Sequence, residues 1–74
     1  KFNKKAAFRV YDELDCPVKE DEQGNLYAEI EIPNDYSLYC YILSFGDNVE
    51  VLEPTKIREQ ITEMIERMAQ KYKN

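Results

Sequence analysis

The stretch NVEVLEPTKIREQITEMIERMAQKY, residues 48–72, decides the fold. After Pro54, apolar residues recur at intervals of one, three and four residues, which places them on one stripe of an α-helix. They are Ile57, Ile61, Met64, Ile65, Met68 and Tyr72, and the residues between them are almost all polar. We therefore predict a long amphipathic helix that begins near Pro54, with either Glu53 or Thr55 as its N-cap.

A short β-like run, residues 49–52, precedes this helix. At the far end of the helix, Lys71 and Lys73 lie where the helix dipole favours cations. Glutamates such as Glu63 lie on the polar face, where ion pairing in solvent is a simpler role than catalysis. The helix therefore shows no chemistry of its own, and function has to come from its context.

Length and composition restrict the chain to one small domain. It has 74 residues, of which 34% are charged, and a chain of this size buries only about 60% of its unfolded surface. Its stability is therefore expected to be marginal without oligomerisation or a neighbouring domain. We predict that residues 1–74 form a single domain, the C-terminal fragment of a larger protein, because the sequence opens on Lys1 rather than Met.

The net charge of −5 disfavours direct contact with nucleic acid, because a phosphate-binding surface is usually basic. Six acidic residues gather in one part of the chain and predict a solvated acidic edge: Asp12, Glu13, Asp15, Glu20, Asp21 and Glu22. There is also no apolar run long enough to span a bilayer and no signal-peptide pattern.

The two cysteines, Cys16 and Cys40, are far apart, and the chain has no histidine. A zinc site would therefore have too few soft ligands. A single disulfide is the alternative, but free thiols fit better with the absence of secretory features. We predict a cytoplasmic protein without a metal or other cofactor.

Near the N-terminus, the pattern predicts a helix over residues 4–14. Asn3 is a suitable N-cap, and Pro17 marks the end, because the residue before a proline is pushed out of the α region. The apolar positions follow at helical spacing and are Ala7, Val10, Tyr11 and Leu14.

Two strands and a second helix follow. Residues 18–22 predict a short edge strand, and residues 23–25 a turn in which Gly24 can take positive φ. Residues 26–32 alternate between apolar and polar side chains, which predicts a strand with one face on the core. Residues 36–45 predict a helix capped by Asn34 or Asp35 and followed by Gly46. Its expected buried stripe is Leu38, Tyr41, Ile42 and Phe45.

The predicted order of helix, strand, strand, helix, strand and helix defines an α+β domain. One more strand in front would give a ferredoxin-like split βαβ sheet with an extra long C-terminal helix. In that fold the first strand lies inside the sheet, between the third and the last. Here the first strand is truncated or supplied in trans. Its place would be filled by upstream sequence, by another chain, or by direct pairing around Ile30 and Val51.

The sequence does not predict an enzyme, because it has no histidine, no phosphate-binding glycine loop and no nucleophile and base pair. Ser44, Gly46 and Arg58 are candidates for contact with an effector or another domain. The alternatives are a Schellman-type cap around Ser44 and Gly46, and a surface arginine paired with Asp47 or Glu53. Tyr39 and Tyr41 are candidate interface residues, because tyrosine is favoured at interfaces; the alternative is that they cover the core.

The chain resembles the C-terminal extension, or WCX domain, of WYL-domain transcriptional regulators. The resemblance covers almost the whole chain, and the first strand typical of the family is reduced to about Phe2 and Asn3. The matching pieces are Ala6-Ala7-x-Arg9-Val10, Ile32-Pro33, Leu43-Ser44-Phe45-Gly46, Val51-Leu52-Glu53-Pro54, Ile57-Arg58 and Tyr72.

This resemblance implies a bacterial parent protein that binds DNA through an N-terminal helix-turn-helix, outside this chain. A WYL domain of the parent would sense an effector. The present domain would then serve regulation and self-association, as a dimer in contact with the WYL domain, with no role at a membrane. The alternative is a ferredoxin-like domain that itself binds a small-molecule effector. An RNA-binding domain fits less well, because Glu29 and Glu31 give the strand around Tyr27 the wrong charge.

Overall fold

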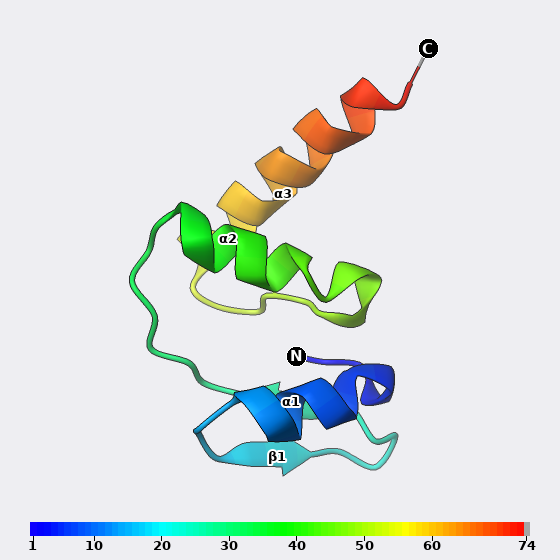
Figure 1. Cartoon of the computed structure of the whole chain (residues 1–74), viewed down its shortest axis with the longest axis vertical. Coiled ribbons are helices and arrows are strands. Elements are labelled where there is room, and N and C mark those ends of the chain that lie inside the picture. The colour runs from blue at the N-terminus through cyan, green and yellow to red at the C-terminus, as the bar shows by residue number, and fades with distance from the viewer. Residues whose placement is uncertain (74) are drawn as a thin grey trace.

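The helix α3 (Thr55–Lys71) extends away from the rest of the molecule in the computed structural model of the chain, which describes residues 1–73 (Figure 1). The molecule is elongated, with extents of 39 × 26 × 20 Å. Helices and a two-stranded antiparallel sheet make it an α+β structure. The other elements are the 3₁₀ turn η1 (Lys4–Ala6), α1 (Ala7–Glu13), β1 (Val18–Glu20), β2 (Leu26–Ala28), α2 (Tyr36–Leu43) and the 3₁₀ turn η2 (Gly46–Asn48).

The first predicted helix is confirmed as η1 followed by α1. The side chain of Asn3 accepts a hydrogen bond from the backbone N–H of Lys5 at 2.9 Å, as expected of an N-cap. Val10 is completely buried. Tyr11, which was expected on the apolar face, is 59% exposed, because the next position along a helix is rotated about 100° from the buried one.

The main core is a small apolar cluster that joins the N-terminus to α1, β2 and the end of α2. Its members are Phe2, Ala6, Val10, Leu26 and Phe45. The rings of Phe2 and Phe45 meet edge to face with their centroids 5.0 Å apart, an arrangement that aromatic pairs prefer. The N-terminal residues are therefore part of the core.

The sheet is shorter than predicted. β1 pairs with β2 in antiparallel register, with Val18 opposite Ala28, and Gly24 takes a φ of +86° in the turn between them. The prediction that the second strand continues to residue 32 is wrong, because it ends at Ala28. Ile30 and Ile32 are 39% and 38% exposed. Alternation of side chains defines a face, but a strand also needs a hydrogen-bonded neighbour, and β1 is too short to provide one.

Phe2 lies between two other segments of backbone. It forms one antiparallel bridge with Leu26 and another with Val49. The prediction of a strand over residues 49–52 is wrong, because only Val49 takes part in β pairing. Hydrogen bonds also join Asn3 to Asn48 and Lys1 to Glu50, but the pairing does not continue to residues 51 and 52.

The second predicted helix is confirmed as α2, with Asp35 rather than Asn34 as its N-cap. The Asp35 side chain accepts a hydrogen bond from the N–H of Leu38 at 3.3 Å. The helix ends at Leu43, two residues earlier than predicted. Gly46 has a φ of +61°, in the left-handed region that favours glycine after a helix. Of the expected apolar stripe, Phe45 is buried and the rest is half-buried.

The long predicted helix is confirmed as α3, but neither candidate side chain caps it. Pro54 occupies the N-cap position, and its carbonyl accepts hydrogen bonds from the N–H groups of Ile57 and Arg58 at 3.1 Å. Ile57 and Ile61 are buried and Met64 is half-buried, whereas the apolar stripe is exposed from Ile65 onward. No helix in residues 1–73 is both long and apolar enough to cross a membrane.

Candidate functional site

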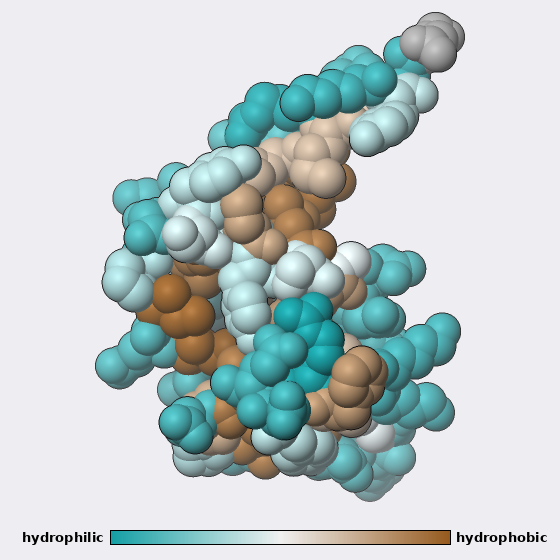
Figure 2. All heavy atoms as spheres, in the orientation of Figure 1, coloured by the Kyte–Doolittle hydropathy of each residue, from teal (hydrophilic) through white to brown (hydrophobic). Residues whose placement is uncertain are grey.

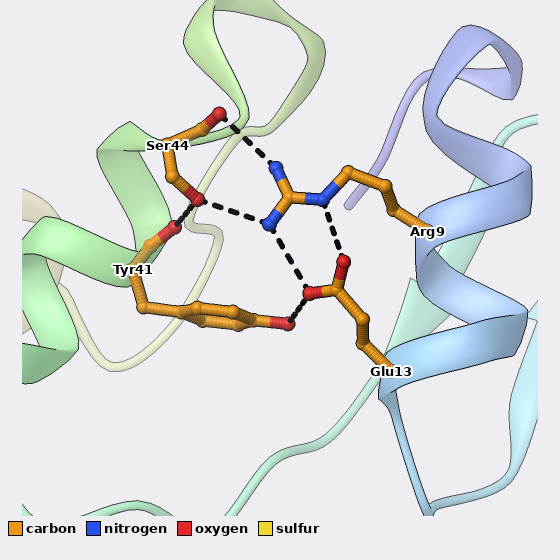
Figure 3. A network of polar contacts seen from close by, with 4 residues as sticks. All are labelled: Arg9, Glu13, Tyr41 and Ser44. Carbon is orange, nitrogen blue, oxygen red and sulfur yellow. Dashed lines mark hydrogen bonds and ion pairs between the residues drawn. The ribbon is translucent and has the colours of Figure 1, made fainter.

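A network of polar contacts joins α1 to the end of α2, with the guanidinium group of Arg9 at its centre (Figure 3). Two of its nitrogens reach the carboxylate of Glu13, Nε to Oε2 at 2.8 Å and Nη2 to Oε1 at 3.1 Å. The other helix is reached through Ser44, whose carbonyl accepts from Nη1 at 3.1 Å and whose hydroxyl accepts from Nη2 at 3.2 Å. The planar group also lies over the ring of Phe45, 3.9 Å from its centroid. This fork geometry is specific to arginine.

Glu13 is held from both helices. The hydroxyl of Tyr41, on α2, donates a hydrogen bond to Oε1 of Glu13 at 2.7 Å. The hydrogen bond from Arg9, followed by that from Tyr41, lowers the pKa of Glu13. Burial, followed by the hydrogen bond to Glu13, raises the pKa of Tyr41. At neutral pH the network therefore combines an ionised carboxylate with a protonated phenol.

This network links α1 to the end of α2, and we refer to its four residues as the clamp: Arg9, Glu13, Tyr41 and Ser44. The charges of Arg9 and Glu13 neutralise each other, and their side chains remain 27% and 34% exposed. Ser44 both accepts from Arg9 and donates its own hydroxyl to the carbonyl of Tyr41. The donors and acceptors are already used within the chain, so the arrangement sets the position of α2 on α1.

Gly46 follows Ser44 at a position open to contact. An added Cβ there would meet no heavy atom within 4 Å. The backbone is therefore accessible on this side, next to the clamp. The positive φ, rather than lack of space, is the reason for glycine at this position.

Arg58 has a different acidic partner from those predicted. Its Nη1 donates to Oε2 of Glu50 and to the carbonyl of Val51, both at 2.9 Å. The pairing with Asp47 or Glu53 is therefore wrong. The hydrogen bond from Arg58 lowers the pKa of Glu50. Both side chains of the pair are 50% exposed, so the guanidinium group remains accessible.

The two tyrosines predicted for an interface lie between helices of this chain. Tyr39 is half-buried, and its hydroxyl contacts the side chains of Asn34 and of Gln60 on α3. Tyr41 is also half-buried and belongs to the clamp with Ser44. Of the five predicted residues, the structure thus brings Tyr41 and Ser44 into one network, while Tyr39 and Arg58 have other partners.

Arg9 and Glu13 are the members of the clamp that were not predicted as site residues. Their spacing of four residues on a helix is the signal that could have drawn attention to them, since such pairs face each other. No local sequence pattern could have predicted their contact with Ser44, because Arg9 and Ser44 are 35 residues apart in the sequence.

Fold and clamp together define a small α+β module in which Arg9 meets Ser44 and Phe45. These residues belong to two of the sequence pieces on which the resemblance was based. The model of the WCX domain family matches residues 1–69, and the chain belongs to this family.

A search of known proteins found a relative in Bacillus subtilis (strain 168), named uncharacterized HTH-type transcriptional regulator YobV. It is 40% identical over 62 residues, which cover 84% of this chain and 19% of the relative. The chain thus spans about a fifth of the length of that relative. No solved structure matches the chain.

Proposed function

We propose that this chain is the C-terminal regulatory and self-association module of a WYL-type helix-turn-helix transcriptional regulator. Membership of the WCX family and the name of the relative, which describes a regulator rather than an enzyme, support this role. The parent would be a cytoplasmic protein that contacts DNA only through its N-terminal domain, since this module carries a net charge of −5.

The same proposal includes a ferredoxin-like sheet whose first strand is shortened. Its support is the order in which the backbone segments lie side by side. Across the sheet this order is Val49, Phe2, Leu26 and Glu20, and each neighbouring pair is antiparallel. This is the neighbour order expected when the first strand lies between the last and the third.

The observation that carries the self-association role is the uncovered apolar stripe of α3. Ile57 and Ile61 are buried, but Ile65, Met68 and Tyr72 are 49%, 45% and 87% exposed. They lie on the part of the helix that extends away from the body (Figure 1). An amphipathic helix normally buries its apolar stripe. We therefore expect this half of α3 to contact another protein surface.

A second copy of α3 in antiparallel orientation fits this surface. Acidic residues dominate the middle of the helix, Glu59, Glu63 and Glu66, and basic residues its end, Arg67 and Lys71, with Lys73 directly after it. Antiparallel pairing places the acidic turns of one copy beside the basic end of the other, which favours the encounter.

Sedimentation equilibrium of the Met68→Glu variant tests this role. A carboxylate in the apolar contact is expected to weaken dimerisation by about tenfold or more, because burying an unpaired charge is costly. Gln70→Glu adds the same charge at an exposed position outside the stripe and should leave the dissociation constant unchanged. A wild-type protein that stays monomeric at all concentrations would refute self-association by this module.

We also propose that Ser44, Gly46 and Arg58 contact the effector or the WYL domain, and that Tyr39 and Tyr41 support the dimer interface. The accessible backbone at Gly46 and the half-exposed guanidinium of Arg58 support the first group. Arg58→Ala in the intact regulator should change its affinity for operator DNA, whereas Lys56→Ala, an exposed cation nearby, should not. An unchanged affinity in both variants would remove Arg58 from this role.

A further inference from the structure

An open groove of about 580 Å³ lies between α2 and α3. Its lining residues recur at helical spacing, so each helix contributes one face to it. A volume of this size is within the range of small-molecule sites in proteins. The lining residues are Tyr36, Cys40, Leu43 and Ser44 from α2 and its C-cap, and Met64, Arg67, Met68 and Lys71 from α3.

The least exposed part of this groove is apolar. Leu43 and Met64 are half-buried, and Met68 is 45% exposed. Methionine side chains are unbranched and adapt to apolar groups of different shapes. Figure 2 shows apolar surface in the angle between α2 and α3, whereas the outer side of α3 is hydrophilic. The groove therefore offers a surface for the hydrocarbon part of a ligand.

The charged residues of the groove are both basic. Arg67 and Lys71 are four residues apart on α3 and therefore lie on the same side of the helix. The ion pairs within residues 1–73 involve other residues, so neither cation has an acidic partner in that part of the chain. A guanidinium group and an ammonium group near each other attract a carboxylate. Although the net charge of the chain is −5, no carboxylate lines this groove.

A groove on another face of α2 has the opposite charge. It lies between α1, α2 and residues 29–32, and Ile30 and Ile32 belong to its apolar lining. The charged residues that line it are all acidic and are Glu13, Asp15, Glu29 and Glu31. An apolar anion and an apolar cation of the same size should therefore select different grooves.

We propose that the groove between α2 and α3 binds an amphipathic carboxylate with an alkyl chain. Its carboxylate pairs with Arg67 and Lys71, and its chain packs on Met64 and Met68. A singly charged head group fits better than a dianion, because the chain as a whole is negative. Ser44 lines the same groove, so the inference gives a ligand class to the effector contact proposed for Ser44 and rests on the proposed function in this respect.

Nuclear magnetic resonance of methyl groups tests the site on the 74-residue chain. Met64 and Met68 are the two methionines of the sequence, so their labelled methyls report on this groove, and those of Ile30 and Ile32 report on the acidic groove. Decanoate, below the concentration at which it forms micelles, should shift both methionine methyls to saturation and leave the two isoleucine methyls unchanged. Acetate lacks the chain and decyltrimethylammonium has the opposite charge, so both should bind beside the methionines at least about tenfold more weakly.

Two matched double variants test the role of the charges. Arg67→Gln combined with Lys71→Gln should weaken the binding of decanoate by about tenfold or more, because two charge-assisted contacts are lost. Lys19→Gln combined with Lys56→Gln removes the same charge at exposed positions outside the groove and should leave the affinity unchanged.

The ligand series on the natural sequence decides the proposal even if a variant fails to fold. Methionine methyls that decanoate leaves unshifted would overturn it, and so would equal binding of decanoate and decyltrimethylammonium at this groove. An equal loss of affinity in the two double variants would also overturn it. Shifts of Met68 on protein dilution are recorded first, without decanoate, so that self-association through α3 is measured separately. The DNA affinity of Arg58→Ala is independent of this titration, so either idea can fail while the other holds.

Discussion

Arg9 connects two helices through one side chain. Its guanidinium group reaches Glu13, the carbonyl and hydroxyl of Ser44, and the face of the Phe45 ring. Lysine could not reproduce these contacts, because its ammonium group is a point charge rather than a planar fork. At the residue scale, the position of α2 on α1 therefore depends on the identity of one residue and on the ionisation of its partner.

The ionisation of Glu13 predicts a specific pH dependence. Its pKa in the folded protein lies below the ordinary value of 4.5, because Arg9 and Tyr41 donate hydrogen bonds to it. Such a carboxylate stabilises the fold above its unfolded-state pKa, and the contribution is lost as the pH falls through the folded-state pKa. The difference in free energy of unfolding between wild type and Glu13→Gln should thus be constant near neutral pH and shrink below about pH 4.5.

Urea unfolding followed by circular dichroism across this pH range measures the difference. Because Glu50 also has a lowered pKa, Glu50→Gln serves as a control for acidic groups outside the clamp. A difference between wild type and Glu13→Gln that stays constant into the acid range would show that Arg9 and Glu13 are not paired in solution.

The candidate site was only partly predictable at this scale. Ser44 and Tyr41 were singled out from their types and from their place near a helix end, whereas Arg9 was not. Spacing along a helix can suggest that Arg9 meets Glu13, but a contact between α1 and the end of α2 depends on the tertiary arrangement. The partner of Arg58 was missed for the same reason, since Glu50 comes from the segment before α3.

At the scale of elements, the helices were predictable, whereas the strands were predictable only in part: β1 and β2 lie where they were expected but are shorter, and the strand over residues 49–52 is absent. α1, α2 and α3 follow from apolar periodicity and from caps such as Asn3 and Asp35, which are properties of neighbouring residues. The strands predicted over residues 26–32 and 49–52 have suitable side chains, but a strand also needs a partner. β1 pairs with residues 26–28 and Phe2 forms one bridge to each segment, and regular pairing extends no further.

The turn after α2 predicts a measurable cost for a small substitution. Gly46 has a φ of +61°, where a residue with a Cβ is strained although there is space for it. Gly46→Ala should lower the free energy of unfolding by about 1 kcal/mol. Gly46→Asn should cost less, because asparagine tolerates this conformation better. Equal stability of wild type and Gly46→Ala in thermal unfolding would mean that the turn takes another conformation in solution.

At the scale of the whole molecule, stability depends on a small core. Five buried residues form the main cluster, and Leu26 and Val10 are its fully buried side chains. The buried residues of α3, Ile57 and Ile61, lie outside this cluster. A domain of this size has little stability to lose, so single changes in the cluster should affect the entire fold.

Leu26→Ala tests the importance of this cluster. Removing a fully buried leucine side chain typically costs about 2–5 kcal/mol, a large part of the stability of a small domain. Ile65→Ala, at a position that is 49% exposed, should have a much smaller effect in the monomer. Chemical denaturation at low protein concentration compares the two variants. Similar losses of stability would show that the cluster around Leu26 is not the centre of the fold.

The two free thiols lie in different surroundings. Cys16 is half-buried and, together with Ile30 and Ile32, lines an open groove between α1 and α2, whereas Cys40 is exposed on α2. The rates at which an alkylating reagent modifies the two thiols of the native protein can therefore be compared, with Cys40 as the internal reference. Because Cys16 is half-buried and Cys40 is exposed, Cys16 should be modified more slowly than Cys40. The ratio of the two rates would then report how accessible this groove is in solution, without any engineered label.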